Sequence, residues 1–460
     1  MNIHLVGLFL IYSCLFLEAK DTFKEFKPQV ASSQSNAVKT DKNDKRWELC
    51  KLEPQKSFYD KTKPSTLPTT PLKSIESLGP KVYIDVQEQN ISSQQEEYID
   101  NTEGTNIDFF GINITINIPQ SMTKAAFEPK NQAGVIKFFD TMAQSEYKEF
   151  LDNLKKISSN LSLNDWGVYM LVSNLSNKVY QDRDSSKLFR WFVLNKLGYG
   201  VKVGVSNSKI ILMHYAKNIY HAPNCTFEGK KYYILEDAKD ISALYVYRDE
   251  PSVSVKEFDF SLEKLPLISK DIRVKDIKFL YNGNEYVFKI PYNKNLVDFM
   301  ATYPVVGYDI YLNAAMEEAT YTALAKSFRE YINSKRSSEA MDFVLHFIQN
   351  AFIYEVDSTQ FGKQKTMFAQ ESLVYDKSDC EDRVVLFAYL VKRFFDVEIA
   401  ALKYDDHISS ALYIPMSGDK VKIKSKDFIK ADPSYANASI GDGMQKYKNI
   451  APKDYIMMSK

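Results

Sequence analysis

The sequence predicts an α+β fold whose strands pair antiparallel. Helical periodicity runs through residues 132–197 and returns over residues 314–334 and 338–352. Short segments rich in β-branched and aromatic residues occupy residues 232–295, where Asn282-Gly283 marks a tight hairpin turn. A last apolar helix, residues 381–395, precedes a run of short strands. Helices and strands that are grouped in this way are typical of α+β proteins.

Composition limits the classes of partner. The 460 residues include 59 Lys+Arg and 59 Asp+Glu, so the formal net charge is zero. Since no basic excess exists to neutralise phosphates, we expect no nucleic-acid partner. The 30 Tyr and 29 Phe favour β-rich packing and grooves that hold extended peptides. Neither metal-ligand spacing nor a Gly-rich phosphate loop is evident, so no metal and no cofactor is expected.

The N-terminus resembles an export signal. Residues 5–17 form a nearly unbroken apolar run, which has the length of a signal-peptide core and is too short to span a membrane comfortably. The preceding residues lack Lys and Arg, which is atypical. Lipidation at Cys14 is the alternative, although Tyr12 stands where a small residue is required. We therefore predict a signal peptide over residues 1–19 and a periplasmic or extracellular location.

Five segments follow from the pattern. After the signal peptide, residues 20–75 predict a disordered spacer within which Trp47, Leu49 and Cys50 could dock. Residues 82–231 predict a mixed α/β region, with a strand at 109–118 and helices at 132–145, 146–161, 163–180 and 185–197. Residues 232–313 predict a β-rich domain, and residues 314–460 predict the domain that carries the chemistry.

Three cysteines remain once the signal peptide is removed. An odd number in an oxidising compartment leaves one thiol unpaired. Cys50 and Cys225 could pair and leave Cys380 free, but the sequence does not establish the pairing. The stretch SDCEDR at residues 378–383 precedes the last apolar helix. Ser378 and Glu381 have capping-box spacing, so Cys380 is predicted in the first helical turn, where the helix dipole favours a thiolate.

A histidine and an aspartate follow in positions that suit this thiol. The chain is predicted to form a strand over residues 397–404, to turn at Asp405-Asp406 and to return over 407–414, so His407 starts the returning strand. Another strand, residues 427–431, ends at Asp432, which could orient the imidazole. Each residue alone has an ordinary structural explanation. Their order on helix, strand and strand is far more specific.

These segments resemble a known family. SDCEDR is similar to the Gly-Asp-Cys-Glu-Asp-Arg/Lys signature of bacterial transglutaminase-like domains, which have a papain-like fold with the cysteine at a helix N-terminus and the histidine and aspartate on an antiparallel sheet. His407 and the DPSY stretch at 432–435 match the second and third motifs, and residues 347–354 and 370–373 resemble the lead-in. The resemblance covers about residues 338–440. Ser378 departs from the usual glycine.

The resemblance implies roles for four residues. Cys380 would be the nucleophile, His407 the base and Asp432 its orienter. Gln349 would assist the oxyanion, or would instead be a buried polar group that ties its helix to the catalytic loop. The implied reaction is thiolate attack on a peptide or glutamine carboxamide carbonyl, followed by acyl transfer to water or to an amine, with hydrolysis favoured. Glu381 and Asp382 are expected to serve the helix start.

Two further interpretations stay open. A protein or peptide of the cell envelope is the expected substrate partner, but a non-catalytic binding or scaffold protein could retain the same fold. Residues 184–204 also echo residues 380–400, as a polar start, an apolar helix and a strand. A shift of 196 residues puts Asp184 opposite Cys380 and Ile211 opposite His407. Either a degenerate copy of the domain or generic helix–strand packing explains this similarity.

Overall fold

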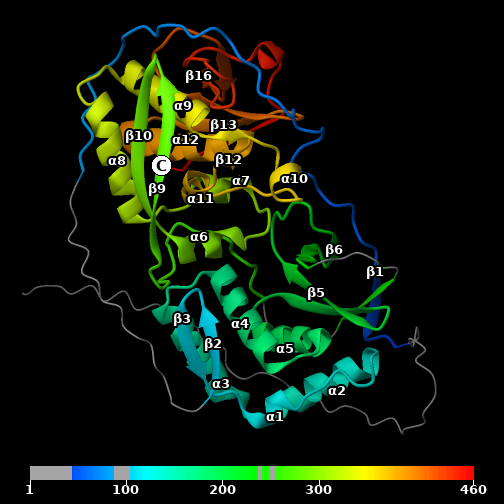
Figure 1. Cartoon of the computed structure of the whole chain (residues 1–460). Helices are drawn as coiled ribbons and strands as arrows, with labels where there is room; N and C mark the ends of the chain where they lie inside the picture. Colours follow the sequence, from blue (N-terminus) through cyan, green and yellow to red (C-terminus); the bar gives the residue numbers. More distant parts are fainter. Residues whose placement is uncertain (1–43, 87–103, 237–240, 242, 249–254, 460) are drawn as a thin grey trace, which may run out of the picture.

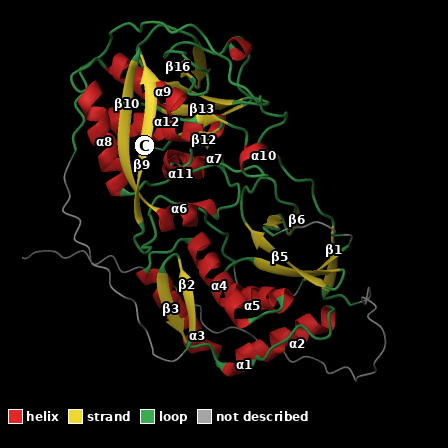
Figure 2. Ribbon diagram, in the orientation of Figure 1, coloured by secondary structure: helices red, strands yellow, loops and turns green. Residues whose placement is uncertain are grey.

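The computed structural model describes residues 44–86, 104–236, 241, 243–248 and 255–459. It is a mixed α+β structure with curled antiparallel sheets (Figure 2), as the pattern of elements predicted. The predicted signal peptide at residues 1–19, with Cys14, lies outside the described residues. In the described ranges, no helix combines the length and the apolar character that a membrane span needs.

The first half of the molecule, which comprises β1 and the described part of residues 104–248, lies at the bottom of Figure 1. It begins with a hairpin of β2 (Thr105–Phe109) and β3 (Ile112–Ile116). Five helices follow: α1 (Gln120–Thr123), α2 (Gln132–Ala143), α3 (Tyr147–Asn160), α4 (Asp165–Val179) and α5 (Arg183–Lys196). The half ends in a sheet of order β1-β8-β4-β5-β7-β6, whose strands are β1 (Trp47–Cys50), β4 (Val201–Ser206), β5 (Lys209–Tyr215), β6 (Asn224–Phe227), β7 (Lys230–Tyr233) and β8 (Leu244–Tyr247).

The second half, residues 255–459, lies above the first (Figure 1). It begins with the hairpin of β9 (Ile272–Tyr281) and β10 (Asn284–Asn293). Its helices are α6 (Lys294–Ala301), α7 (Tyr308–Leu312), α8 (Glu318–Ile332), α9 (Ser337–Ala351), α10 (Asp357–Gln360), α11 (Ala369–Val374) and α12 (Cys380–Phe395). A short parallel pair, β11 (Ile353–Tyr354) and β12 (Lys377–Ser378), precedes α12. The final sheet has the order β15-β16-β14-β13-β17, with strands β13 (Ile399–Lys403), β14 (Ile408–Leu412), β15 (Lys420–Ile423), β16 (Lys426–Ala431) and β17 (Asp454–Met457).

The two halves repeat one order of elements. In the first, β2 packs on α4 and β3 on α3; in the second, β9 packs on α9 and β10 on α8. The helix that precedes each sheet, α5 or α12, then packs on the first two strands of that sheet. The sheets share a strand order, since β8-β4-β5-β7-β6 corresponds to β17-β13-β14-β16-β15. The weak similarity between residues 184–204 and 380–400 therefore falls on elements of the same topology.

A pair of residues with positive φ forms the turn of each hairpin. Asn282 and Gly283 have φ of 50° and 77°, which these two residue types tolerate at a tight two-residue turn, and the predicted hairpin is confirmed. The strand predicted over residues 109–118 is wrong at its start. Phe110 and Gly111 have φ of 48° and 81° and form a second such turn, so β2 ends at Phe109.

The β-rich range at residues 232–313 is shared between the two halves. Strand β8 joins the first sheet between β1 and β4, whereas the β9–β10 hairpin packs on α8 and α9. Residues 294–312 contain the helices α6 and α7, which the sequence pattern did not indicate. Lys256, also within residues 232–313, makes an isolated bridge to Tyr199.

The predicted spacer at residues 20–75 is corrected over its described part, residues 44–75. Residues 51–64, called the strap below, run without regular secondary structure along one side of the molecule from β1 (Figure 1). Phe58, Tyr59 and Lys63 are buried in spite of the polar composition. A disulfide joins Cys50, just before the strap, to Cys225 on β6. The strap is thus folded against both halves rather than disordered.

Candidate functional site

Cys380 is the first residue of α12, as the sequence predicted. The N-cap is Asp379 rather than Ser378, because the capping pair is shifted by one residue: Asp382 accepts the Asp379 N–H at 3.2 Å. Asp382 also accepts the Met367 N–H at 2.7 Å, so it holds the helix start as expected. Ser378 instead accepts a hydrogen bond from the Arg383 guanidinium at 3.2 Å. Behind the cysteine, α12 is buried on nearly all sides from Val384 to Val391, which makes its tip a fixed position.

The Cys380 thiol is fully enclosed. Its exposed fraction is 0%, and its Sγ lies 3.4 Å from the Tyr59 hydroxyl and 3.3 Å from Glu381 Oε2. Burial raises the pKa of Cys380 well above its ordinary value, and the Glu381 and Asp379 carboxylates raise it further. Burial and these carboxylates thus disfavour the expected thiolate in this closed arrangement. In the structure Sγ donates to Glu381 Oε2.

His407 and Asp432 are in direct contact. The His407 Nε2 lies 2.9 Å from Asp432 Oδ2, and both side chains are buried. Asp432 is fixed in turn, since its Oδ1 accepts the Ser434 N–H at 2.9 Å. The other imidazole nitrogen, Nδ1, is buried and has no hydrogen-bond partner among the described residues. An imidazole that is held on one side by a carboxylate and left free on the other can accept a proton at the free side.

Tyr447 packs on the imidazole of this pair. Its ring stacks on the His407 ring with centroids 5.1 Å apart. Burial and a hydrogen bond to Asp406 raise the pKa of Tyr447. No hydrogen bond joins Sγ to His407 in the structure, because the thiol is held by Tyr59 and Glu381 instead.

Gln349 contacts the aspartate's backbone rather than the cysteine. Its Nε2 donates to the carbonyl oxygens of Asp432 at 3.2 Å and Ala438 at 2.9 Å, while its Oε1 is buried without a hydrogen-bond partner. These contacts tie α9 to the loop that carries Asp432. Of the two roles considered for Gln349, the structural tie is the one that its contacts match.

A buried cluster of carboxylates surrounds the ammonium group of Lys63. Its Nζ donates to Asp357 at 3.0 Å, to Glu381 at 2.9 Å and to Asp379. Although burial opposes the ionised form, Lys63 lowers the pKa of Glu381 to about 2. Burial and the charge of Glu381 raise the pKa of Asp357 to about 7, against the opposing effect of Lys63. Glu381 therefore does more than serve the helix start, since it joins Lys63, Tyr59 and the thiol.

The same carboxylates are the described groups with metal-ligand geometry. Asp379, Cys380 and Glu381 form one set, and Asp357, Asp379 and Asp382 form the other. Ligand atoms in each set lie within 4.8 Å of one another. The donors are mostly carboxylate oxygens, which suit a hard cation. Lys63 already places a positive charge among them, so a metal ion would have to displace its ammonium group.

Sequence reasoning missed Tyr59, Lys63 and Tyr447. The first two lie in a polar stretch without periodicity and reach the cysteine across more than 300 residues of sequence, with separations of 321 and 316 residues for their contacts with Cys380 and Asp379. A usable signal was the pair Phe58-Tyr59, which is out of place in a solvated spacer. Tyr447 had no such signal.

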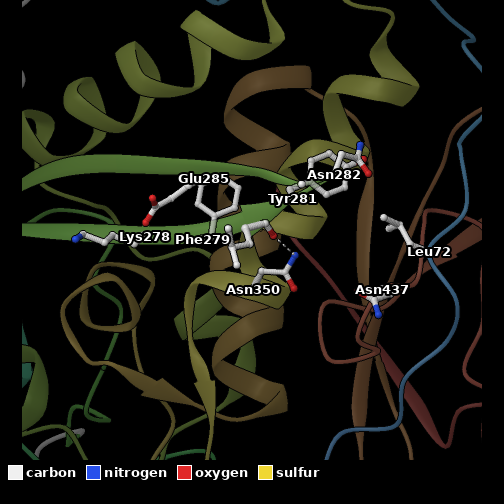
Figure 3. Close-up of a pocket in the computed structure, with 10 residues that line it drawn as sticks. Leu72, Lys278, Phe279, Tyr281, Asn282, Glu285, Asn350 and Asn437 are labelled. Carbon is white, nitrogen blue, oxygen red and sulfur yellow. Dashed lines mark hydrogen bonds between the residues drawn. The ribbon is translucent and has the colours of Figure 1, made fainter.

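A cavity of about 630 Å³ opens beside the β9–β10 turn and is lined by Leu72, Tyr281, Asn350 and Asn437 among others (Figure 3). Asn350 points into it and donates to the Leu280 carbonyl at 3.0 Å. None of the four predicted site residues lines this cavity. A second cavity of about 650 Å³ is lined by both halves, with Tyr220, His221 and Glu236 from the first and Tyr303, Val305 and Lys365 from the second.

The first half has other residues at the equivalent positions. Gly198 and Asp396 both end their helices with positive φ, and the next strands start at Val201 and Ile399, a shift of 198 residues (399 − 201). The proposed shift of 196 is therefore wrong there, because Val397 precedes its strand. The corrected shift puts Asp182 opposite Cys380 and Lys209 opposite His407.

The first half also has a carboxylate at the position that corresponds to Asp432. Strands β7 and β16 differ by 196 residues (426 − 230), which puts Glu236 opposite Asp432. Glu236 pairs with Arg190 at 2.8 Å and Lys187 at 3.0 Å rather than with a histidine. Without a thiol and an imidazole at these places, the first half lacks the groups for thiol-dependent acyl transfer. No protein-family model, curated protein or solved structure matches the chain.

Proposed function

We propose that the chain is an exported, cysteine-dependent acyl-transfer enzyme of papain-like architecture, with Cys380 as nucleophile, His407 as base and Asp432 as orienting acid. The observation that carries this proposal is the His407–Asp432 contact of 2.9 Å with the free Nδ1 on the other side of the ring. The placement of Cys380 at the tip of a buried helix supports it further.

The reaction runs in two stages. His407 Nδ1 takes the thiol proton as Sγ attacks the carbonyl carbon of a peptide or carboxamide, and the first-turn N–H groups of α12 stabilise the oxyanion. The amine or ammonia leaves with that proton, and a thioester remains on Cys380. Water then attacks the thioester, with His407 as base, and releases the acid. We favour water over an amine acceptor because no described feature specifies an amine site.

One feature supports the location. The Cys50–Cys225 disulfide is typical of proteins in oxidising compartments outside the cytoplasm. Exposed proteins or peptides of the cell envelope are the substrates that an exported enzyme would meet.

Turnover of a peptide library in the presence of a labelled primary amine tests the proposal. We expect cleaved or deamidated products that disappear in Cys380→Ala and in His407→Asn, with melting temperatures close to that of the native chain. Labelled adducts that outnumber hydrolysis products would overturn the preference for water. Equal turnover by native chain and Cys380→Ala would overturn the nucleophile.

A non-catalytic scaffold is the second candidate. The specific observation in its favour is the fully buried thiol, which contacts Tyr59 and Glu381 and has no hydrogen bond to an imidazole. In that case a thiol-directed probe would leave Cys380 unmodified even after the strap residues are changed.

A further inference from the structure

The strap separates the cysteine from the cavity between the halves. On the inner side, Tyr59 touches Sγ, as described above. On the outer side, the Phe58 ring packs on the Tyr59 ring at 4.9 Å and on the Tyr220 ring at 5.3 Å. The Phe58 N–H also donates to His221 Nε2 at 3.4 Å. Because Tyr220 and His221 line the cavity of about 650 Å³, two aromatic side chains stand between that cavity and the thiol.

The surface beneath the strap already binds a segment of polypeptide through backbone groups. In the first half, the Glu53 N–H donates to the Asn224 carbonyl at 2.8 Å, and the His221 backbone N–H donates to the Lys56 carbonyl at 2.9 Å. In the second half, the N–H groups of Asp60 and Lys61 donate to the Asp405 carbonyl at 2.8 and 3.0 Å. Backbone hydrogen bonds of this kind recognise an extended chain whatever its side chains are.

No carbonyl can reach Sγ while the strap is in place, since the exposed fraction of Cys380 is 0%. The α12 helix, the sheet behind it and the His407 loop are packed in the core, whereas the strap has no regular secondary structure and buries only Phe58, Tyr59 and Lys63. Local opening favours irregular segments with few buried side chains. The strap is therefore the part of the enclosure that can open, at the cost of releasing its two core rings and the Lys63 ion pairs.

We propose that the cavity between the halves, together with the path of the strap, is the binding site for an extended peptide substrate, and that the strap occupies its inner end as an internal pseudosubstrate. This inference rests on the proposed function for its substrate class. When the strap lifts, the cavity and the thiol become one continuous cleft. A peptide then takes over the hydrogen bonds that the strap makes now.

The test uses alkylation of Cys380 by iodoacetamide, followed by peptide mass mapping. The variant Phe58→Ala/Tyr59→Ala removes both rings and keeps Lys63 with its ion pairs. We expect its Cys380 to be alkylated at least ten times faster than that of the native chain. Lys61→Ala is the matched control, because its side chain is 69% exposed and pairs only with Asp405 among the described groups, so its rate should stay native.

Tyr59→Phe covers the case in which the double variant fails to fold. It keeps the ring and its packing but loses the hydroxyl contacts to Sγ and Glu381, so a smaller increase in the same direction is expected. Unchanged alkylation in Tyr59→Phe and in a folded double variant would overturn the barrier. Folding is checked by melting temperature in each case.

The peptide-binding part is tested with a synthetic peptide of residues 54–66 added to the double variant, or to Tyr59→Phe if the double variant does not fold. We expect it to slow alkylation several-fold at concentrations where a scrambled peptide does not. Equal rates with both peptides would overturn the pseudosubstrate assignment. Fast alkylation and peptide protection without any turnover would instead reject the proposed function and leave the peptide site standing.

Discussion

His407 Nε2 and Asp432 Oδ2 lie 2.9 Å apart in a buried setting, and the Asp432 carboxylate is itself oriented by the Ser434 N–H. This contact fixes the imidazole ring, so that Nδ1 is the nitrogen left to exchange a proton. Tyr447 stacks on the ring and prevents it from tilting. In the proposed reaction, the base would thus be positioned before any substrate arrives, which is the condition for efficient proton transfer.

Asp432→Asn should lower kcat/KM by about 10² to 10⁴-fold, because the amide can hold the imidazole in the wrong tautomer and cannot stabilise its charged form. The melting temperature should change little, since an amide oxygen can still accept the Ser434 N–H. Asp427→Asn, an exposed position on the same strand, is the control and should keep native kinetics. A native kcat/KM for Asp432→Asn would remove the aspartate from the mechanism.

Gln349→Met should lower the free energy of unfolding by about 1 to 3 kcal/mol, because the carbonyl oxygens of Asp432 and Ala438 lose a buried donor. We expect less than a tenfold loss in kcat/KM. Urea unfolding and steady-state kinetics check the two effects together. A hundredfold loss of kcat/KM with native stability would instead assign the side chain to the oxyanion.

Cys50→Ser/Cys225→Ser should lower the free energy of unfolding by about 2 to 4 kcal/mol, because the bond closes a long loop of 175 residues. The same double variant should also show faster alkylation of Cys380, since the N-terminal end of the strap is no longer tethered. Denaturant unfolding and the iodoacetamide assay measure both. Native alkylation in the reduced and mutated chain would show that the tether has no part in closing the site.

Asp357→Asn should change the pH dependence of stability. The pKa of Asp357 is raised from 3.8 to about 7 in the folded chain, so its favourable contribution is complete below about pH 4 and is lost as pH rises through 7. The amide does not titrate. We therefore expect the variant to gain about 1 to 3 kcal/mol relative to the native chain between about pH 5 and 8. If the melting temperatures of the variant and the native chain differ by a constant amount across this pH range, the raised pKa of Asp357 is contradicted.

The sequence was informative where chemistry and periodicity are local. Helix α12 with Cys380 at its tip, the turn before His407 and the strand that ends at Asp432 all follow from patterns within a few residues. The sequence indicated the repeated topology only weakly, because strand order depends on pairing between distant segments. Tyr59 and Lys63 could not be found in this way, since a polar segment without periodicity becomes ordered only through contacts with a surface that is encoded elsewhere.

The correct register of the two halves was also beyond the sequence. Val201 and Val397 look alike, but only the positions of the left-handed residues Gly198 and Asp396 show that Val201 corresponds to Ile399. A two-residue error in the shift moved each comparison to a neighbouring side chain.

The disulfide makes the strap a tether between the two halves. Cys50 is bonded to the first half, while Tyr59 rests on the thiol of the second half, and nine residues of chain can span at most about 30 Å. Any hinge movement that separated Cys50 from Cys380 by more than this length would pull the Tyr59 phenol away from Sγ. Entry of a bulky ligand between the halves and exposure of the Cys380 thiol would then be coupled in a single motion, with the strap as the tether.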